Sequence, residues 1–208
     1  MHPLKPPSTV FHGTDSEFDR FAIDCCLGAH FGTKRSAIDR LRSTGRLKIE
    51  FQTYTSGDDW YVREMNWSNR PAFEHGPFDT EDDAECFCMT APGERAPIAF
   101  EIDVYRPLEV PDLGTWEFNT VVQHLARNES DRLVADWDRV WNAWNRSNEA
   151  GWEALKAQIT QAGFDCLAYR NETEDPGSVS WIVMDADKIH KAWTPSMEAQ
   201  PVRERMRA

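Results

Sequence analysis

The sequence has no long hydrophobic run. Its 208 residues have a mean hydropathy of −0.63, and no stretch approaches the roughly 20 apolar residues that a transmembrane helix requires. The first residues, Met1 to Pro7, lack the apolar core of a secretory signal peptide. We therefore expect a cytoplasmic protein without a membrane-embedded segment.

Cysteine is scarce, and the five cysteines follow no pattern that serves disulfides or zinc. An odd number of cysteines in a chain of this length is not a disulfide framework. Cys25 and Cys26 are adjacent, and one residue separates Cys86 from Cys88, whereas paired zinc ligands are typically about two to four residues apart. We expect ordinary thiols and no metal site.

Basic residues are outnumbered, with 23 lysines and arginines against 35 acids and a net charge of −12. Such a surface repels phosphate backbones, so we do not expect a nucleic-acid partner. A small dinucleotide remains compatible with this charge because a few local donors can hold it. A basic protein partner is compatible as well.

Strand and helix patterns alternate along the chain in an order that favours an α+β fold. Short β-prone runs occur near both ends, and residues 117–161 predict a helical insertion. Trp137, Trp141 and Trp144 share one helix face, which is typical of a core or a helix–helix seam, with a ligand-binding or partner surface as the alternative. We expect one domain over 1–195, with an irregular insertion at 46–95 and a loose tail at 196–208.

Three segments carry chemistry-bearing residues at the edges of predicted strands. The first is the run Phe11-His12-Gly13-Thr14, and the second is Gly28-Ala29-His30-Phe31-Gly32-Thr33, followed by the start of a helix that Thr33 or Ser36 could cap. The third runs from Gly163 through Tyr169 and Ser180 to Ile189. We expect the three segments to build one nucleotide-binding cleft.

In order and composition, these segments resemble the ADP-ribosyltransferase superfamily. They are most similar to the diphtheria-toxin and poly(ADP-ribose)-polymerase branch, whose motif is His-Tyr-Glu, and within it to small transferase domains of phage and bacterial conflict proteins. The resemblance implies two split, bent β-sheets with surrounding helices and NAD, as substrate, in the cleft between them. It also implies action in the cytoplasm of a bacterial or phage-infected cell.

The resemblance implies a role for each matching residue. His12 would hydrogen-bond the nicotinamide ribose, Gly13 would offer its backbone to the nicotinamide amide, and Thr14 would help to hold the ribose or the adenosine side. His30, with Phe31 beside it, stands at the position of the family's stacking tyrosine. An imidazole can stack, but a protonated ring would repel the cationic nicotinamide.

The sequence departs from the family at the glutamate, because Ser180 stands where the family has that residue. Cleavage of the nicotinamide–ribose bond develops positive charge on the ribose, and serine cannot stabilise it by charge. A carboxylate is therefore expected elsewhere in the cleft. Glu172 and Glu174 are equivalent candidates, although their loop can also be a polar turn built on Pro176-Gly177.

The implied activity is transfer of ADP-ribose from NAD to a protein acceptor, with release of nicotinamide. Two alternatives stay open. With water as the acceptor the same cleft would make an NAD glycohydrolase. With Ser180 in place of the glutamate, the domain could instead be a catalytically inactive binding module, in which His12 is a structural histidine.

Overall fold

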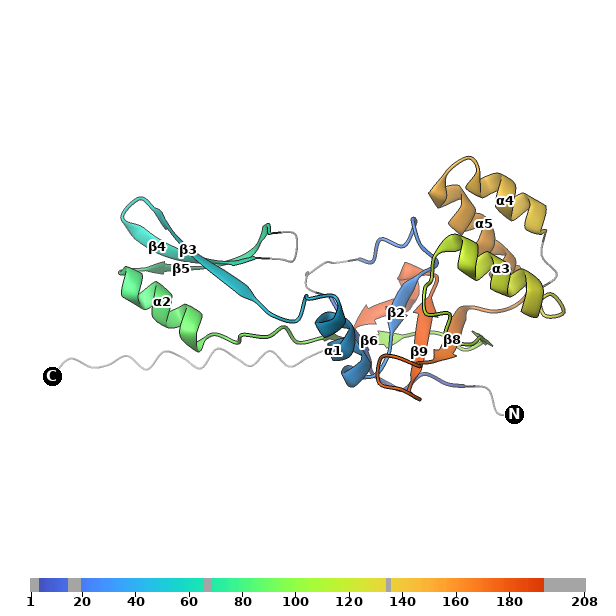
Figure 1. Ribbon diagram of the computed structural model, residues 1–208, viewed down its shortest axis with the longest axis horizontal. Coiled ribbons are helices and arrows are strands. Elements are labelled where there is room, and N and C mark those ends of the chain that lie inside the picture. Colours follow the sequence, from blue (N-terminus) through green and yellow to red (C-terminus); the bar gives the residue numbers. More distant parts are fainter. Residues whose placement is uncertain (1–3, 15–19, 66–68, 134–135, 193–208) are drawn as a thin grey trace.

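The computed structural model describes residues 4–14, 20–65, 69–133 and 136–192, and the expected tail at 196–208 lies outside them. The described residues form five α-helices and three small open sheets (Figure 1), so the α+β class is confirmed. No helix in these ranges combines the length and the apolar character that a membrane crossing requires.

Two of the sheets form the body of the molecule and take their strands from distant parts of the chain. The first sheet is antiparallel and has the order β1-β6-β10, from Val10–His12, Ile98–Ile102 and Ile189–Lys191. The second has the order β2-β9-β8-β7, from Ala29–Phe31, Val179–Val183, Cys166–Arg170 and Pro107–Glu109, and only its β7–β8 pair is parallel.

A shared core packs these two sheets together. Val10 and Phe100 of the first sheet lie against Phe31 and Trp181 of the second, and all four side chains are at least 95% buried. The backbones also meet, because Phe11 and Gly32 exchange two hydrogen bonds of 2.9 and 3.0 Å. The end of β1 is therefore fixed beside the end of β2.

Helices cover the opposite face of the second sheet. Alternate residues of its strands, such as Leu167 and Ile182, point to this face and contact α3 (Phe118–Asn128), α4 (Trp137–Trp144) and α5 (Asn148–Gln161). The helical character predicted for 117–161 is confirmed. The predicted tryptophan stripe packs against this core, and Trp144 stacks on Phe118 with ring centroids 4.0 Å apart.

The first helix, α1 (Lys34–Ser43), follows β2 directly. Thr33 is its N-cap, since the Thr33 hydroxyl accepts a 3.0 Å hydrogen bond from the Ser36 backbone N–H. Ala37 and Leu41 face the interior and are buried. The helix predicted in this segment is confirmed, and of the two candidate caps, Thr33 and Ser36, the structure selects Thr33. Helix α1 lies beside the junction of β1 and β2.

Residues 46–95 are not irregular, and that prediction is wrong. They form an antiparallel meander of β3 (Glu50–Ser56), β4 (Asp59–Met65) and β5 (Pro71–Phe78), with α2 (Glu81–Thr90) packed on one face around the buried Val62. This unit, which we call the lobe, projects from the body (Figure 1). Its two connections are hydrogen-bonded to each other, from Ile49 to Gly93 and from Arg95 to Leu47.

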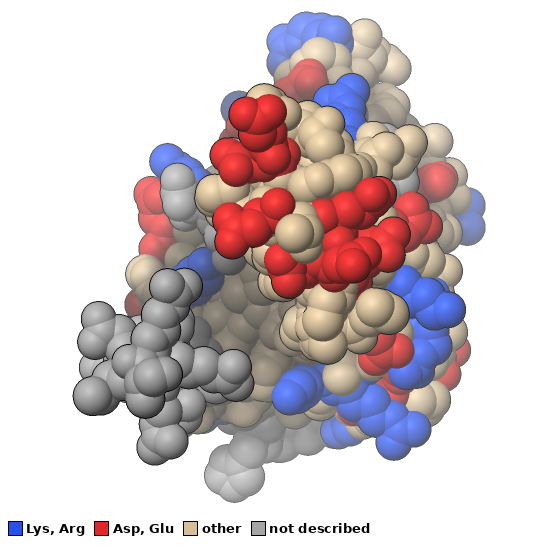
Figure 2. Space-filling model, turned by 90° about the vertical axis from the view of Figure 1, so that its left-hand side faces the viewer, with Lys and Arg blue, Asp and Glu red and all other residues tan. Residues whose placement is uncertain are grey.

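Acidic side chains gather on the side of the molecule that the lobe occupies (Figure 2). Residues 50–92 contain ten acidic and two basic residues, so most of the net negative charge of the chain belongs to the lobe. The exposed acids include those at the β3–β4 turn and the start of α2, namely Asp58, Asp59, Asp79, Glu81, Asp82 and Asp83.

Candidate functional site

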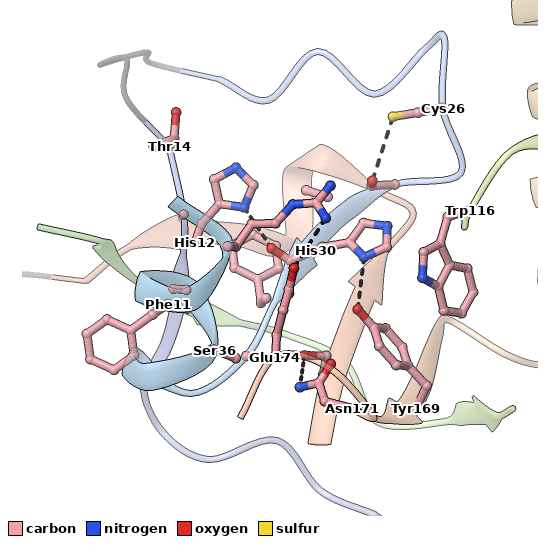
Figure 3. Close-up of a pocket in the computed structure, with 18 of the residues that line it drawn as sticks. Phe11, His12, Thr14, Cys26, His30, Ser36, Trp116, Tyr169, Asn171 and Glu174 are labelled. Carbon is pink, nitrogen blue, oxygen red and sulfur yellow. Dashed lines mark hydrogen bonds and ion pairs between the residues drawn. The ribbon is translucent and has the colours of Figure 1, made fainter. Parts of the chain in front are cut away.

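A cleft of about 630 Å³ opens where β1, β2, α1 and the β8–β9 loop converge. All three segments singled out in the sequence contribute to its walls. Figure 3 shows the side chains of His12, His30 and Glu174 directed into this cleft, each from a different part of the chain. The expected gathering of the three segments around one cleft is therefore seen in the structure.

His12 is held in one orientation by the neighbouring strand. Its Nδ1 donates a 2.7 Å hydrogen bond to the backbone carbonyl of His30, and its ring lies edge-on to Phe21 at 5.0 Å. A carbonyl can only accept, so the proton of the neutral ring resides on Nδ1 and Nε2 carries the lone pair. Burial, with a smaller contribution from the Arg40 charge, lowers the pKa of His12 below its usual value.

His30 lies in an aromatic wall of the cleft. Its Nδ1 is 3.2 Å from the Tyr169 hydroxyl, and its ring meets Trp116 edge-to-face at 5.5 Å. Burial, together with the charge of Arg40, lowers the pKa of His30 to about 3. The imidazole is therefore neutral at physiological pH, which removes the repulsion that a protonated ring would exert on a cationic ligand.

Glycine is required at two points of the cleft because neighbouring atoms fill the space of a side chain. A Cβ at Gly13 would lie 2.7 Å from the backbone oxygen of Ala37 in α1. A Cβ at Gly32 would lie 2.3 Å from the Ser36 hydroxyl and 2.7 Å from that of Ser180. These close approaches bring α1, β1 and β9 together around the cleft.

Ser180 is buried at the base of the cleft and is bound within the protein. Its hydroxyl accepts a 2.8 Å hydrogen bond from the side-chain amide of Asn171, a residue that is itself buried. Ser180 and Asn171 thus form a neutral, hydrogen-bonded pair. The serine contributes a polar wall and no charge.

The structure separates the two candidate glutamates. Among the described residues that line the cleft, Glu174 is present and Glu172 is not. The Glu172 backbone donates to Asp112, and its side chain is exposed. Glu174 is partly covered and pairs with Arg40 of α1, with 3.2 Å between Nη1 and Oε1. Of the two glutamates, Glu174 is therefore the one that reaches the cleft, which Asp112 also lines.

The other two predicted residues occupy different positions. Thr14 lines the cleft beyond the end of β1 (Figure 3). Phe31 borders the cleft, but its ring is 1% exposed and packs into the core between the sheets, 5.5 Å from the ring of His12. Phe31 thus packs against His12 from the core side of the cleft.

Several lining residues escaped the sequence analysis because only the tertiary structure brings them near the motifs. Trp116 comes from the segment before α3, and its ring lies 4.7 Å from that of Tyr169. Burial raises the pKa of Tyr169 to about 12, so its hydroxyl stays protonated. A turn is predicted by the run Pro111-Asp112-Leu113-Gly114, and this could have drawn attention to Asp112. No sequence pattern pointed to Trp116.

The assembled groups define what the cleft can do. It offers a lone pair on His12, an aromatic wall, the carboxylates of Asp112 and Glu174, and the guanidinium groups of Arg40 and Arg46. Such a set suits a ligand with a flat ring, hydroxyl groups and anionic oxygens. In the described part of the chain, no group of three or more His, Cys, Asp or Glu side chains could hold a metal ion.

No family model, curated protein or solved structure matches this chain.

Proposed function

We propose that this protein is an NAD-dependent mono-ADP-ribosyltransferase that transfers ADP-ribose to a protein acceptor and releases nicotinamide. The observation that carries the proposal is the convergence of His12, His30 and Glu174 in one cleft. These residues come from the first two strands and the loop before β9. Their positions in the chain are those at which the ADP-ribosyltransferase resemblance expects a ribose ligand, a stacking ring and an acceptor-side loop.

The architecture supports the same proposal. Two small sheets share a core, join at a bridge between Phe11 and Gly32, and leave the cleft beside that bridge. This arrangement agrees with the split, bent sheets of an ADP-ribosyltransferase-like fold. The helices α3 to α5 then correspond to an insertion on the outer face of the second sheet.

In the proposed mechanism the neutral histidines bind and the carboxylate stabilises charge. The Nε2 lone pair of His12 accepts a hydrogen bond from a hydroxyl of the nicotinamide ribose. The uncharged ring of His30, with Trp116 and Tyr169 beside it, packs against the nicotinamide. As the glycosidic bond breaks, its electron pair leaves with nicotinamide, and the Glu174 carboxylate stabilises the positive charge on the ribose.

Glu174 also lies on the loop that the resemblance associates with the acceptor. A nucleophile from a protein side chain would attack the anomeric carbon of the ribose and form the new glycosidic bond. With water as the nucleophile the reaction becomes NAD hydrolysis. The cleft serves both reactions, and the acceptor experiment below distinguishes them.

Nicotinamide release and acceptor labelling test this proposal. The purified protein is incubated with NAD, and nicotinamide is quantified chromatographically. In parallel, biotinylated NAD is added together with a bacterial lysate. We expect nicotinamide release and a labelled protein, and a loss of at least about 100-fold in both for His12→Ala. His190→Ala is the matched control, because His190 is exposed on β10 and pairs with Asp103.

Each other outcome has a defined meaning. Nicotinamide release without labelled protein would identify an NAD glycohydrolase. Neither release nor measurable NAD binding would contradict the proposal and favour a binding module that retains the fold alone. Full activity of the His12 variant would remove His12 from the site.

A further inference from the structure

Helix α1 turns a polar stripe toward the cleft. Ser36, Arg40 and Ser43 are spaced by four and three residues, so they lie on one side of the helix, and all three line the cleft. Arg46 extends the same wall beyond the C-terminus of the helix. This wall therefore combines hydroxyl groups with two guanidinium groups and faces the wall that carries Tyr169.

Arg40 and Glu174, which both line the cleft, form an ion pair with each other. The guanidinium Nη1 lies 3.2 Å from the carboxylate, with the arginine side chain 63% and the glutamate side chain 24% exposed. An ion pair that faces solvent contributes little to stability, so its partners can exchange at low cost. Figure 3 shows the Glu174 side chain of this pair near His12 and His30.

The β8–β9 loop does not depend on this pair for its position. The next residue, Asp175, accepts a 2.6 Å hydrogen bond from the Thr33 hydroxyl, and its backbone N–H donates to Asp39 at 3.3 Å. The buried Asn171 side chain also binds Ser178 and Ser180 within the loop and strand. The loop thus stays against α1 when Arg40 releases Glu174.

We propose that Arg40 binds the diphosphate of the dinucleotide and that this exchange frees Glu174 to act on the ribose. The inference rests on the proposed function, since it takes NAD as the ligand. A guanidinium group binds phosphate oxygens through two parallel hydrogen bonds, and a diphosphate offers more charge and more acceptors than one carboxylate. When the substrate binds, its diphosphate therefore replaces the Glu174 carboxylate as the partner of Arg40.

The exchange makes the reactive carboxylate dependent on the substrate. Without a ligand, Glu174 is neutralised by Arg40. With the diphosphate bound, the guanidinium charge is satisfied by phosphate, and the Glu174 carboxylate is left to face the ribose. Arg40 is then a binding residue, and the ion pair seen in the structure is the resting state of the site.

Binding of ADP and of adenosine to variants tests the exchange without any catalytic turnover. ADP carries the diphosphate and adenosine lacks it. For Arg40→Gln we expect ADP affinity, measured by calorimetry, to fall by about tenfold or more while adenosine affinity is unchanged. Arg42→Gln is the matched control, because Arg42 lies on the same helix and pairs with Asp39 at 3.0 Å.

Glu174→Gln provides the decisive second measurement. Removal of the competing carboxylate should strengthen ADP binding several-fold, while nicotinamide release from NAD falls by at least about 100-fold. A residue with a merely structural role would not move binding and turnover in opposite directions. Unchanged ADP affinity in Glu174→Gln, or wild-type ADP affinity in Arg40→Gln, overturns the inference, as does a wild-type protein that fails to bind ADP.

The inference and the proposed function can fail separately. If NAD is turned over and Arg40→Gln binds ADP normally, the function stands and the exchange does not. If ADP binding depends on Arg40 and is strengthened in Glu174→Gln, but the wild type never releases nicotinamide, the anion site stands and the activity does not.

Discussion

At the scale of single residues, the two histidines of the cleft differ in what fixes them. His12 is oriented by a backbone carbonyl, so its tautomer is set by the pairing of strands. His30 is oriented by the Tyr169 hydroxyl and covered by Trp116. Both are held neutral by burial. Neutral rings suit a ligand that carries a cationic base.

The lowered pKa of His30 predicts a stability loss in mild acid. The unfolded chain takes up a proton as the pH falls through 6.5, whereas the folded state does so only near its pKa of about 3. Protonation therefore favours unfolding between these values, and the loss from about pH 7 to about pH 5 should be about 2 kcal/mol.

Urea unfolding at the two pH values measures this effect. The comparison is with His30→Gln, which keeps a polar side chain but has no group that titrates in this range. The carboxylates contribute equally to both proteins, so the difference isolates His30. Equal pH dependence of the wild type and the variant would show that the folded state protonates His30 as readily as the unfolded chain.

At the scale of elements, the site depends on how closely α1 approaches the two sheets. The helix is capped at Thr33, one residue after Gly32, and Gly32 brings the Ser36 and Ser180 hydroxyls near one backbone atom. The end of β2, the start of α1 and the neighbouring strand β9 thus meet closely because residue 32 has no side chain. The cleft wall is built from this contact.

Gly32→Ala tests this close packing. The added methyl would lie within 2.7 Å of two hydroxyl oxygens, so we expect the free energy of unfolding to fall by about 1 to 3 kcal/mol. Gly93→Ala is the control, because a Cβ at that position meets nothing within 4 Å. Denaturant unfolding should show a change within about 0.5 kcal/mol for the control. Similar changes in both variants would contradict the packing argument.

The lobe shows why most regular structure between 46 and 95 was missed, apart from the clean alternation of Leu47 to Tyr54, which predicts a strand where β3 lies. Its strands mix acids with aromatics, and their pattern becomes regular only when pairing is known. Arg63 of β4 then lies opposite Glu74 of β5, and Glu64 pairs with His75 at 2.9 Å. Two prolines fall within β5, which is tolerated because β5 is an edge strand.

At the scale of the whole molecule, the body and the lobe differ in what they carry: the cleft and the core clusters in one, most of the net charge in the other. The cleft and both hydrophobic core clusters belong to the body. Most of the net negative charge belongs to the lobe, on the side shown in Figure 2. The acidity that argues against a nucleic-acid partner is therefore concentrated away from the residues of the cleft.

This division predicts that the lobe can be removed without unfolding the body. Residues 50–92 are replaced by an Asn-Gly turn, since the connections on either side are already paired through Ile49 and Gly93 and through Leu47 and Arg95. We expect one cooperative unfolding transition and ADP affinity within a few-fold of the wild type. Loss of cooperative unfolding, with a helical circular-dichroism signal that melts gradually, would show that the body needs the lobe.

The sequence by itself determined the fold class, the first helix with two candidate caps, the helical segment and the three segments around the cleft. These depend on local patterns: the spacing of apolar residues, the capping hydroxyl of Thr33, and glycines beside His12 and Phe31. Each of these signals depends only on residues that are close together in the sequence, and the structure agrees with them.

Only the tertiary structure decided which of the two glutamates reaches the cleft and what surrounds it. Glu172 and Glu174 are two residues apart in a loop, and the direction of each depends on contacts with Asp112 and Arg40, which lie far away in the sequence. Trp116 joins the site for the same reason. Pairing across long sequence separations leaves no local trace, because the contact exists only once the sheets and α1 have packed.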